Sequence, residues 1–219
     1  MPLNNNLIEA TKTFVKTELA DAEGGHDWFH IERVYNNALI ISKGETVDTL
    51  IVALGALLHD IADSKFYDGD DTVGPKKATQ FLQKHKVEIT IIDHVVNIIK
   101  NISFSANIDK INTFNSIELQ VVQDADRLDA LGAIGIARTF NYGGFKNRAI
   151  YNPEIKPNLK MTKEEYKAST APTLNHFYEK LLLLKDTMNT KTGRKIAEER
   201  HNYMVSFLEQ FFAEVNGEK

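Results

Sequence analysis

The sequence contains no cysteine. This absence excludes a disulfide framework and a thiolate metal site. No apolar stretch reaches the roughly 18–20 residues that a membrane-spanning helix needs. Basic residues are not in excess either, and the formal net charge of −4 argues against a general nucleic-acid or membrane binder. The N-terminus does not resemble a signal peptide, so we expect a soluble, cytoplasmic protein.

Strand-type alternation, internal repeats and low-complexity tracts are also missing, and helical periodicity dominates the chain. The segment 46–63 is apolar almost throughout, which predicts a central buried helix. The other expected helices cover about 7–19, 28–43, 74–85, 88–102, 116–131 and 132–140, followed by two long amphipathic helices within 163–215 that separate near 189–193. Segments 103–114 and 141–157 are expected to be irregular. The 219 residues therefore predict one all-α domain over 1–219.

The pattern that points to chemistry is the dipeptide His59-Asp60, which ends the apolar run Leu50–Leu58. Other ligand-type residues lie at long range on either side of it: His26, His30, Asp124 and Asp126. Imidazoles and carboxylates together suit a divalent ion such as Mn, Mg, Ni, Co, Fe or Zn. Such an ion activates water, so the sequence predicts a metal site assembled from three separate segments.

Spacing limits which of these residues can share one site. His26 and His30 are four residues apart, so on a helix they would lie on one face. Asp124 and Asp126 are two apart, so a helix cannot aim both at one spot, and we expect one ligand from this pair. Taken singly, each residue is more often a core, cap or ion-pair residue. Taken together they favour a metal, because buried carboxylates are costly unless they are paired, hydrogen-bonded or metal-bound.

Three segments, His26–Val34, Ala56–Lys65 and Val121–Ala130, resemble the HD superfamily of metal-dependent phosphohydrolases. The family pattern is His, then His-Asp, then Asp in chain order. The segment Gly132–Phe140 is similar to a bacterial subgroup of HD-domain hydrolases, some of which cleave nucleoside triphosphates. With His176–Lys180 and Arg200-His201, the resemblance covers nearly the whole chain. It implies an HD-type helical bundle with a motif core over about 26–140, on which C-terminal helices at about 163–215 pack.

The resemblance also implies the roles of single residues. It assigns the metal ligands as His30, His59, Asp60 and Asp126. His26 is then a group near the metal or facing the substrate, and Asp124 is structural.

Further catalytic and substrate-binding roles are expected around these ligands. Asp63 is a candidate general base, although it could equally cap its helix or pair with Lys65. Asp129 shares a helix face with Asp126 and could bond a ligand histidine. Cations would stabilise the charge that develops on a phosphoryl group, and the candidates beside His26 are Arg33, Lys65, Arg127 and Arg138. The segment Tyr142–Gly144 is a candidate loop that closes over the substrate.

The favoured function is a phosphohydrolase with a single metal ion that splits pyrophosphate from a nucleoside triphosphate. A 5′-nucleotidase activity is the alternative within the same class, and a non-catalytic nucleotide sensor is the alternative outside it. The expected partner is a small phosphorylated substrate, a nucleotide, rather than a nucleic-acid polymer or a membrane. A homodimer formed through the C-terminal helices is compatible with the sequence.

Overall fold

The computed structural model describes residues 5–20, 27–61, 70–102, 114–162, 165 and 168–219. Every regular element within these ranges is a helix, which confirms the all-α prediction. None of the described helices is long and apolar enough to cross a membrane.

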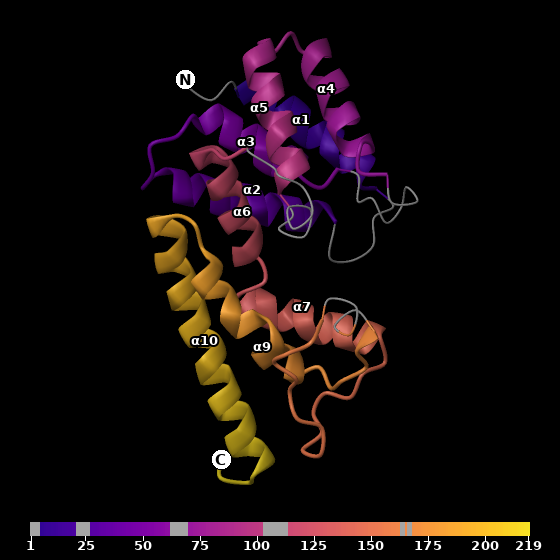
Figure 1. Ribbon diagram of the computed structural model, residues 1–219, viewed down its shortest axis with the longest axis vertical. Coiled ribbons are helices and arrows are strands. Elements are labelled where there is room, and N and C mark those ends of the chain that lie inside the picture. The colour runs from indigo at the N-terminus through magenta and orange to yellow at the C-terminus, as the bar shows by residue number, and fades with distance from the viewer. Residues whose placement is uncertain (1–4, 21–26, 62–69, 103–113, 163–164, 166–167) are drawn as a thin grey trace. The chain divides into compact units, whose positions relative to one another are not determined.

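The chain divides into two compact units (Figure 1). Unit 1 comprises Met1–Asp126 together with Asn189–Gly193, and unit 2 comprises Arg127–Met188 together with Arg194–Lys219. The boundaries fall inside the helix α6 (Ile117–Leu128) and inside the first turn of α10 (Lys191–Val215).

Unit 1 is built around the helix α3 (Thr49–Leu58), which packs against helices on several sides. Every residue from Leu50 to Leu58 is buried, as expected for a helix that is apolar all round. At Gly55 an added Cβ would lie 3.1 Å from Ile98 and 3.4 Å from Val122, so α3 lies close to two further helices. The neighbours of α3 are α1 (Asn5–Glu18), α2 (Trp28–Ser42), α5 (Ile89–Asn101) and α6.

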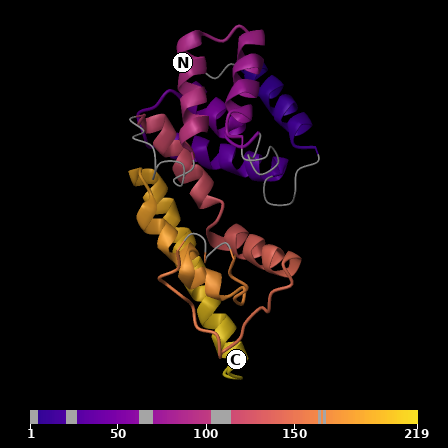
Figure 2. The same ribbon diagram turned by 45° about the vertical axis from the view of Figure 1, so that its right-hand side comes forward.

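The helix α4 (Val73–Lys84) covers α5, and the two lie side by side in both ribbon views (Figures 1 and 2). The α5 pattern of Ile91, Ile92, Val95, Ile98 and Ile99 is buried, as its helical spacing predicted.

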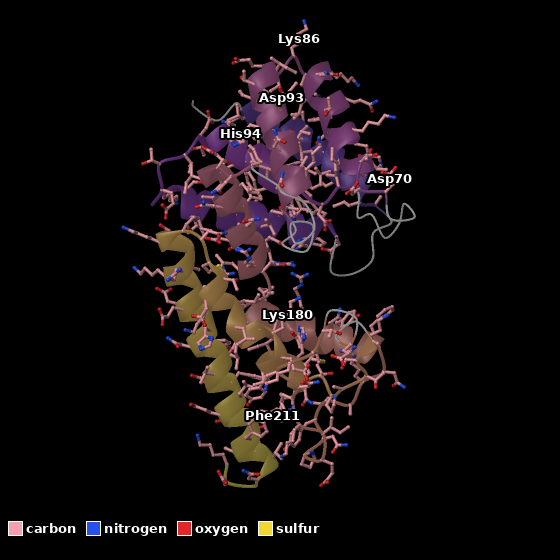
Figure 3. The ribbon with its side chains drawn as sticks, viewed as in Figure 1. Asp70, Lys86, Asp93, His94, Lys180 and Phe211 are labelled. Atoms are coloured by element: carbon pink, nitrogen blue, oxygen red, sulfur yellow. The ribbon has the colours of Figure 1, made fainter. Side chains whose placement is uncertain are left out.

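Unit 2 contains α7 (Gly132–Phe145), the short α9 (Asn175–Glu179), the 3₁₀ helix η3 (Leu181–Thr187) and most of α10. Its core is aromatic: the ring centroids of Phe140, Phe177 and Phe207 lie 5.9 Å from one another. These three side chains come from α7, α9 and α10, so the aromatic cluster joins these helices. Phe211, one turn further along α10, extends it towards Tyr151, with ring centroids 6.0 Å apart (Figure 3).

The structure corrects two expectations about unit 2. Tyr142–Gly144 lies inside α7, which continues to Phe145, so this segment is helix and not a loop. Gly143 is required there by packing, because an added Cβ would lie 2.1 Å from Oγ1 of Thr173. A glycine pair in a helix can therefore mark a close contact rather than a turn.

The prediction that the first C-terminal helix is long is also wrong. Between residues 163 and 174, the described residues are mostly irregular. The helix α9 is short, and the leucine run 181–184 forms part of η3. The predicted break near 189–193 is present, but α10 already begins at Lys191.

Candidate metal centre

Three ligand-type side chains meet at one point of unit 1. His30, His59 and Asp60 each offer one ligand atom, and these atoms lie within 4.8 Å of one another. Asp126 adds a fourth group, since its Oδ1 lies 3.5 Å from Nε2 of His30 and 3.9 Å from Nε2 of His59. The four residues that the sequence resemblance named as ligands are thus neighbours in the fold.

His59 reaches the cluster from the C-terminal end of α3. It is the residue that directly follows the helix, and its side chain is buried. Its Nδ1 lies 2.9 Å from the backbone oxygen of Ala56. A carbonyl oxygen can only accept, so Nδ1 carries the proton and Nε2 is left with a lone pair. This hydrogen bond fixes the tautomer that presents Nε2 as a ligand.

His30 comes from the first turn of α2, and Asp27 holds that turn in place. The Asp27 side chain caps the helix by accepting a hydrogen bond from the backbone N–H of His30 at 2.9 Å. An N-cap aspartate satisfies a backbone donor that the first helical turn leaves open. The sequence analysis did not assign a role to Asp27, although an Asp directly before a predicted helix is a common N-cap residue.

Asp126 comes from α6, and the structure separates it from Asp124. Asp124 is fully buried and accepts hydrogen bonds from the backbone N–H of Asn189 and from the backbone N–H and the hydroxyl of Thr190. It therefore holds the start of α10 within unit 1. Asp126, with 41% of its side chain exposed, faces the two histidines instead.

Asn37 is a further buried polar residue that ties the cluster together. Its Nδ2 donates to the backbone oxygen of Ala125 at 3.3 Å, which links α2 to α6 next to Asp126. Sequence reasoning did not single out Asn37, because an Asn in an amphipathic helix usually faces water.

The remaining predicted residues lie in several places. His26, Asp63 and Lys65 fall outside the described residues. Arg33 is half-buried on α2 of unit 1. In unit 2, Asp129 is buried and pairs with Nη1 of Arg138, whereas Nη1 of Arg127 donates to the backbone oxygen of Thr187 at 2.8 Å.

The donor set fits a divalent cation. It consists of two imidazoles and two carboxylates, without sulfur, which is the ligand chemistry of Mn, Fe, Co, Ni, Zn and Mg sites. His30 and His59 are buried, and their rings meet edge to face with centroids 5.6 Å apart.

Known proteins are similar to this chain in sequence and in fold. The sequence matches the HD domain family over residues 28–131. It is 39% identical to the protein YpgQ of Bacillus subtilis over 211 residues, which cover 95% of this chain and 94% of YpgQ.

Two solved structures extend the comparison. An HD-superfamily hydrolase of Bacillus thuringiensis has a TM-score of 0.78 and 46% identity, covering 97% of this chain and 98% of that one. Bacillus subtilis YpgQ in complex with ADP has a TM-score of 0.74 and 35% identity over 94% of both chains. The chain therefore belongs to the HD superfamily of hydrolases.

Proposed function

We propose that the protein is a metal-dependent phosphohydrolase that acts on nucleotides and splits pyrophosphate from a nucleoside triphosphate. The observation that carries this proposal is the cluster of His30, His59 and Asp60 with Asp126 beside it. Two imidazoles and two carboxylates gathered at one point are a donor set that suits a divalent cation.

A divalent ion bound by these residues supplies a water of lowered pKa and polarises a phosphoryl oxygen. The side chains of the protein provide the orientation. His59 is held in one tautomer by Ala56, His30 is fixed by the Asp27 cap, and Asp126 is carried on α6, which Asn37 ties to α2. A rigid set of ligands leaves little reorganisation to be done when the substrate binds.

The nucleotide part of the proposal has two supports. The similar protein YpgQ has been crystallised in complex with ADP. The family subgroup that the sequence resembles includes enzymes that cleave nucleoside triphosphates.

The proposed roles of the other residues complete the assignment. Asp63 would act as general base and His26 would face the substrate. Arg33 and Lys65 would supply positive charge for the phosphates, whereas Asp129 pairs with Arg138, and Arg127 donates to Thr187, within unit 2.

The test combines metal analysis with product identification. The full chain is assayed for bound metal and then incubated with nucleoside mono-, di- and triphosphates in the presence of Mn, Mg, Co or Ni. Release of a monophosphate and pyrophosphate supports the proposal. Release of phosphate and nucleoside from a monophosphate would instead identify a 5′-nucleotidase.

Variants link the activity to the cluster. His59→Ala and Asp126→Asn are expected to lose both bound metal and turnover. Their matched controls are His85→Ala and Asp93→Asn, two exposed residues of unit 1 that are expected to retain both. Asp93 is labelled in Figure 3. Nucleotide binding without any hydrolysis, whichever metal is supplied, would contradict the enzyme proposal and favour a sensor.

A further inference from the structure

A second concave site lies entirely within unit 2, at the C-terminal end of α7. It is a cavity of about 370 Å³ lined by Tyr142, Lys146, Asn147, Arg148, Ser169 and Thr170, together with Ala168. This volume falls within the range of about 300–1,000 Å³ that is typical of small-molecule sites. The described lining includes two cations, three hydroxyls and an amide but no carboxylate.

The two cations are not needed to cap α7. Lys and Arg near a helix C-terminus often serve the last carbonyl groups. Here the backbone N–H groups of Lys146, Asn147 and Arg148 already donate to the oxygens of Tyr142, Gly144 and Gly143. Asn147 adopts a left-handed conformation, with φ of 51°, which is how this type of cap is formed. The charged groups of Lys146 and Arg148 are therefore not required for the cap of this helix.

Both cations lie over the ring of Tyr142, and Lys146 also lies over the ring of Phe145, with its Nζ 4.9 Å from that centroid. The Nζ of Lys146 lies 5.7 Å from the centroid of Tyr142, and the guanidinium carbon of Arg148 lies 5.6 Å from it. Tyr142 is 50% exposed, so its ring borders the cavity without being covered. Arg148 is also held in place, because its Nη2 donates to the backbone oxygen of Ser169.

The positive charge of Arg148 also acts on a histidine of unit 2. Burial, with smaller contributions from Lys180 and Arg148, lowers the pKa of His176 to about 4. Lys180 directly follows α9 in the same unit (Figure 3). Like charges gathered on a rigid frame repel one another, and an anion would relieve that repulsion.

From this arrangement we infer that unit 2 carries a binding site for a small phosphorylated ligand with a planar ring. Lys146 and Arg148 would bind the phosphate, with Thr170 and Asn147 as neutral donors, and the ring would stack on Tyr142. The cations would bind the phosphate, and the exposed aromatic ring would stack on the planar ring of the ligand. The inference does not rest on the proposed function, because every residue of the site belongs to unit 2 and none belongs to the metal cluster.

The test measures binding to the full-length protein by calorimetry, with EDTA present to remove bound metal. The probes are adenosine 5′-monophosphate, adenosine and inorganic phosphate. The monophosphate is expected to bind more tightly than either adenosine or phosphate alone, because only it engages both halves of the site. Lys146→Gln is expected to weaken monophosphate binding on the order of tenfold, as is typical for loss of one charge-assisted hydrogen bond. Tyr142→Leu is expected to weaken it by a similar factor through loss of stacking.

Matched variants control for general effects of charge and surface. Lys160→Gln removes an exposed charge of unit 2 outside the cavity, and Tyr203→Leu removes a ring that is 58% exposed on α10. Both are expected to bind the monophosphate as the wild type does, and so is Asp126→Asn, which separates this site from the metal cluster. Binding that survives in Lys146→Gln and Tyr142→Leu but is lost in Asp126→Asn would overturn the inference. So would much tighter binding of a single-stranded oligonucleotide than of the monophosphate.

Discussion

At the scale of single residues, hydrogen bonds separate ligands from structural groups that look alike in sequence. Asp124 and Asp126 are two residues apart on one helix. Asp124 is buried among donors from Asn189 and Thr190, whereas Asp126 lies beside the histidine Nε2 atoms. The side-chain chemistry is identical, and the surroundings determine the role.

This contrast predicts opposite outcomes for two alanine variants. Asp124→Ala should lower the free energy of unfolding by at least about 2 kcal/mol, because hydrogen bonds to a charged group contribute about 1.5–3 kcal/mol. Asp126→Ala should leave stability in EDTA nearly unchanged but abolish metal binding. Denaturant unfolding and metal analysis of both proteins provide the measurement. Loss of metal from a stably folded Asp124→Ala protein would reverse the assignment.

The two histidines of the first segment allow a similar test. His30→Ala should lose bound metal, because Nε2 of His30 lies in the cluster. His26→Ala should retain the metal and lower turnover, in line with a substrate-facing role. The measurement is metal content together with kcat for both variants. Metal loss from His26→Ala with retention in His30→Ala would exchange the two roles.

His176 predicts how stability depends on pH. Burial, Lys180 and Arg148 lower its pKa from 6.5 to about 4. Between these values the unfolded chain binds a proton that the folded chain does not, so stability is full above about pH 6.5 and falls as the pH drops towards 4. The loss is on the order of 3 kcal/mol, at about 1.4 kcal/mol for each pH unit.

The measurement is the free energy of unfolding of wild type and His176→Gln at several pH values across this window. The variant should have a flatter profile than the wild type, whereas the exposed-site control His85→Gln should follow the wild type. Parallel profiles for wild type and His176→Gln would contradict the prediction.

At the scale of helices, the sequence predicted the bounds of three helices of unit 1 closely. The segments that became α2, α4 and α5 begin and end within one residue of expectation. The buried helix α3 begins later than predicted, because Asp48 caps its start by accepting hydrogen bonds from the N–H groups of Leu50 and Ile51. An N-cap of this kind sets the residue at which a helix begins. The helix also ends earlier than predicted, at Leu58.

The sequence predicted the ligand residues of the candidate site but not the residues that hold them in position. His30, His59, Asp60 and Asp126 follow from a family resemblance, and the fold brings them together. Asp27 and Asn37 act through backbone contacts that have no pattern across distant segments, so only the folded chain reveals Asn37 beside Ala125.

Two adjacent glycines of α7 provide a matched test of helix packing. Gly143→Ala should destabilise the protein by about 1–3 kcal/mol, because the added methyl group would collide with Thr173. Gly144→Ala, at a position with nothing within 4 Å, should stabilise it by up to about 1 kcal/mol through helix propensity. Thermal unfolding of the two variants gives the comparison, and equal shifts in one direction would show that this packing is looser than described.

At the scale of the whole molecule, the prediction of an all-α HD fold is confirmed. The described chain nevertheless forms two compact units, and the metal ligands all belong to unit 1. The prediction of one domain over residues 1–219 stays a prediction.

Metal binding should therefore stabilise the molecule unevenly. A divalent ion at 100 times its dissociation constant would raise the free energy of unfolding by about 2.7 kcal/mol. Hydrogen exchange should slow mainly in α2, α3 and α6, which carry the ligands, and Asp126→Asn should abolish the effect. Equal slowing in Asp126→Asn would mean that the ion binds elsewhere.

The hydrogen bonds of Asp124 determine how the two units could be produced as separate fragments. The chain passes from one unit to the other after residues 126, 188 and 193, so neither unit is encoded by one continuous stretch. A fragment that stops at Asp126 would lack the Asn189 and Thr190 donors of Asp124 and would leave a carboxylate buried without them. Working halves of this protein would have to be made by joining the 189–193 segment to the first fragment through a new linker, and not by a single cut.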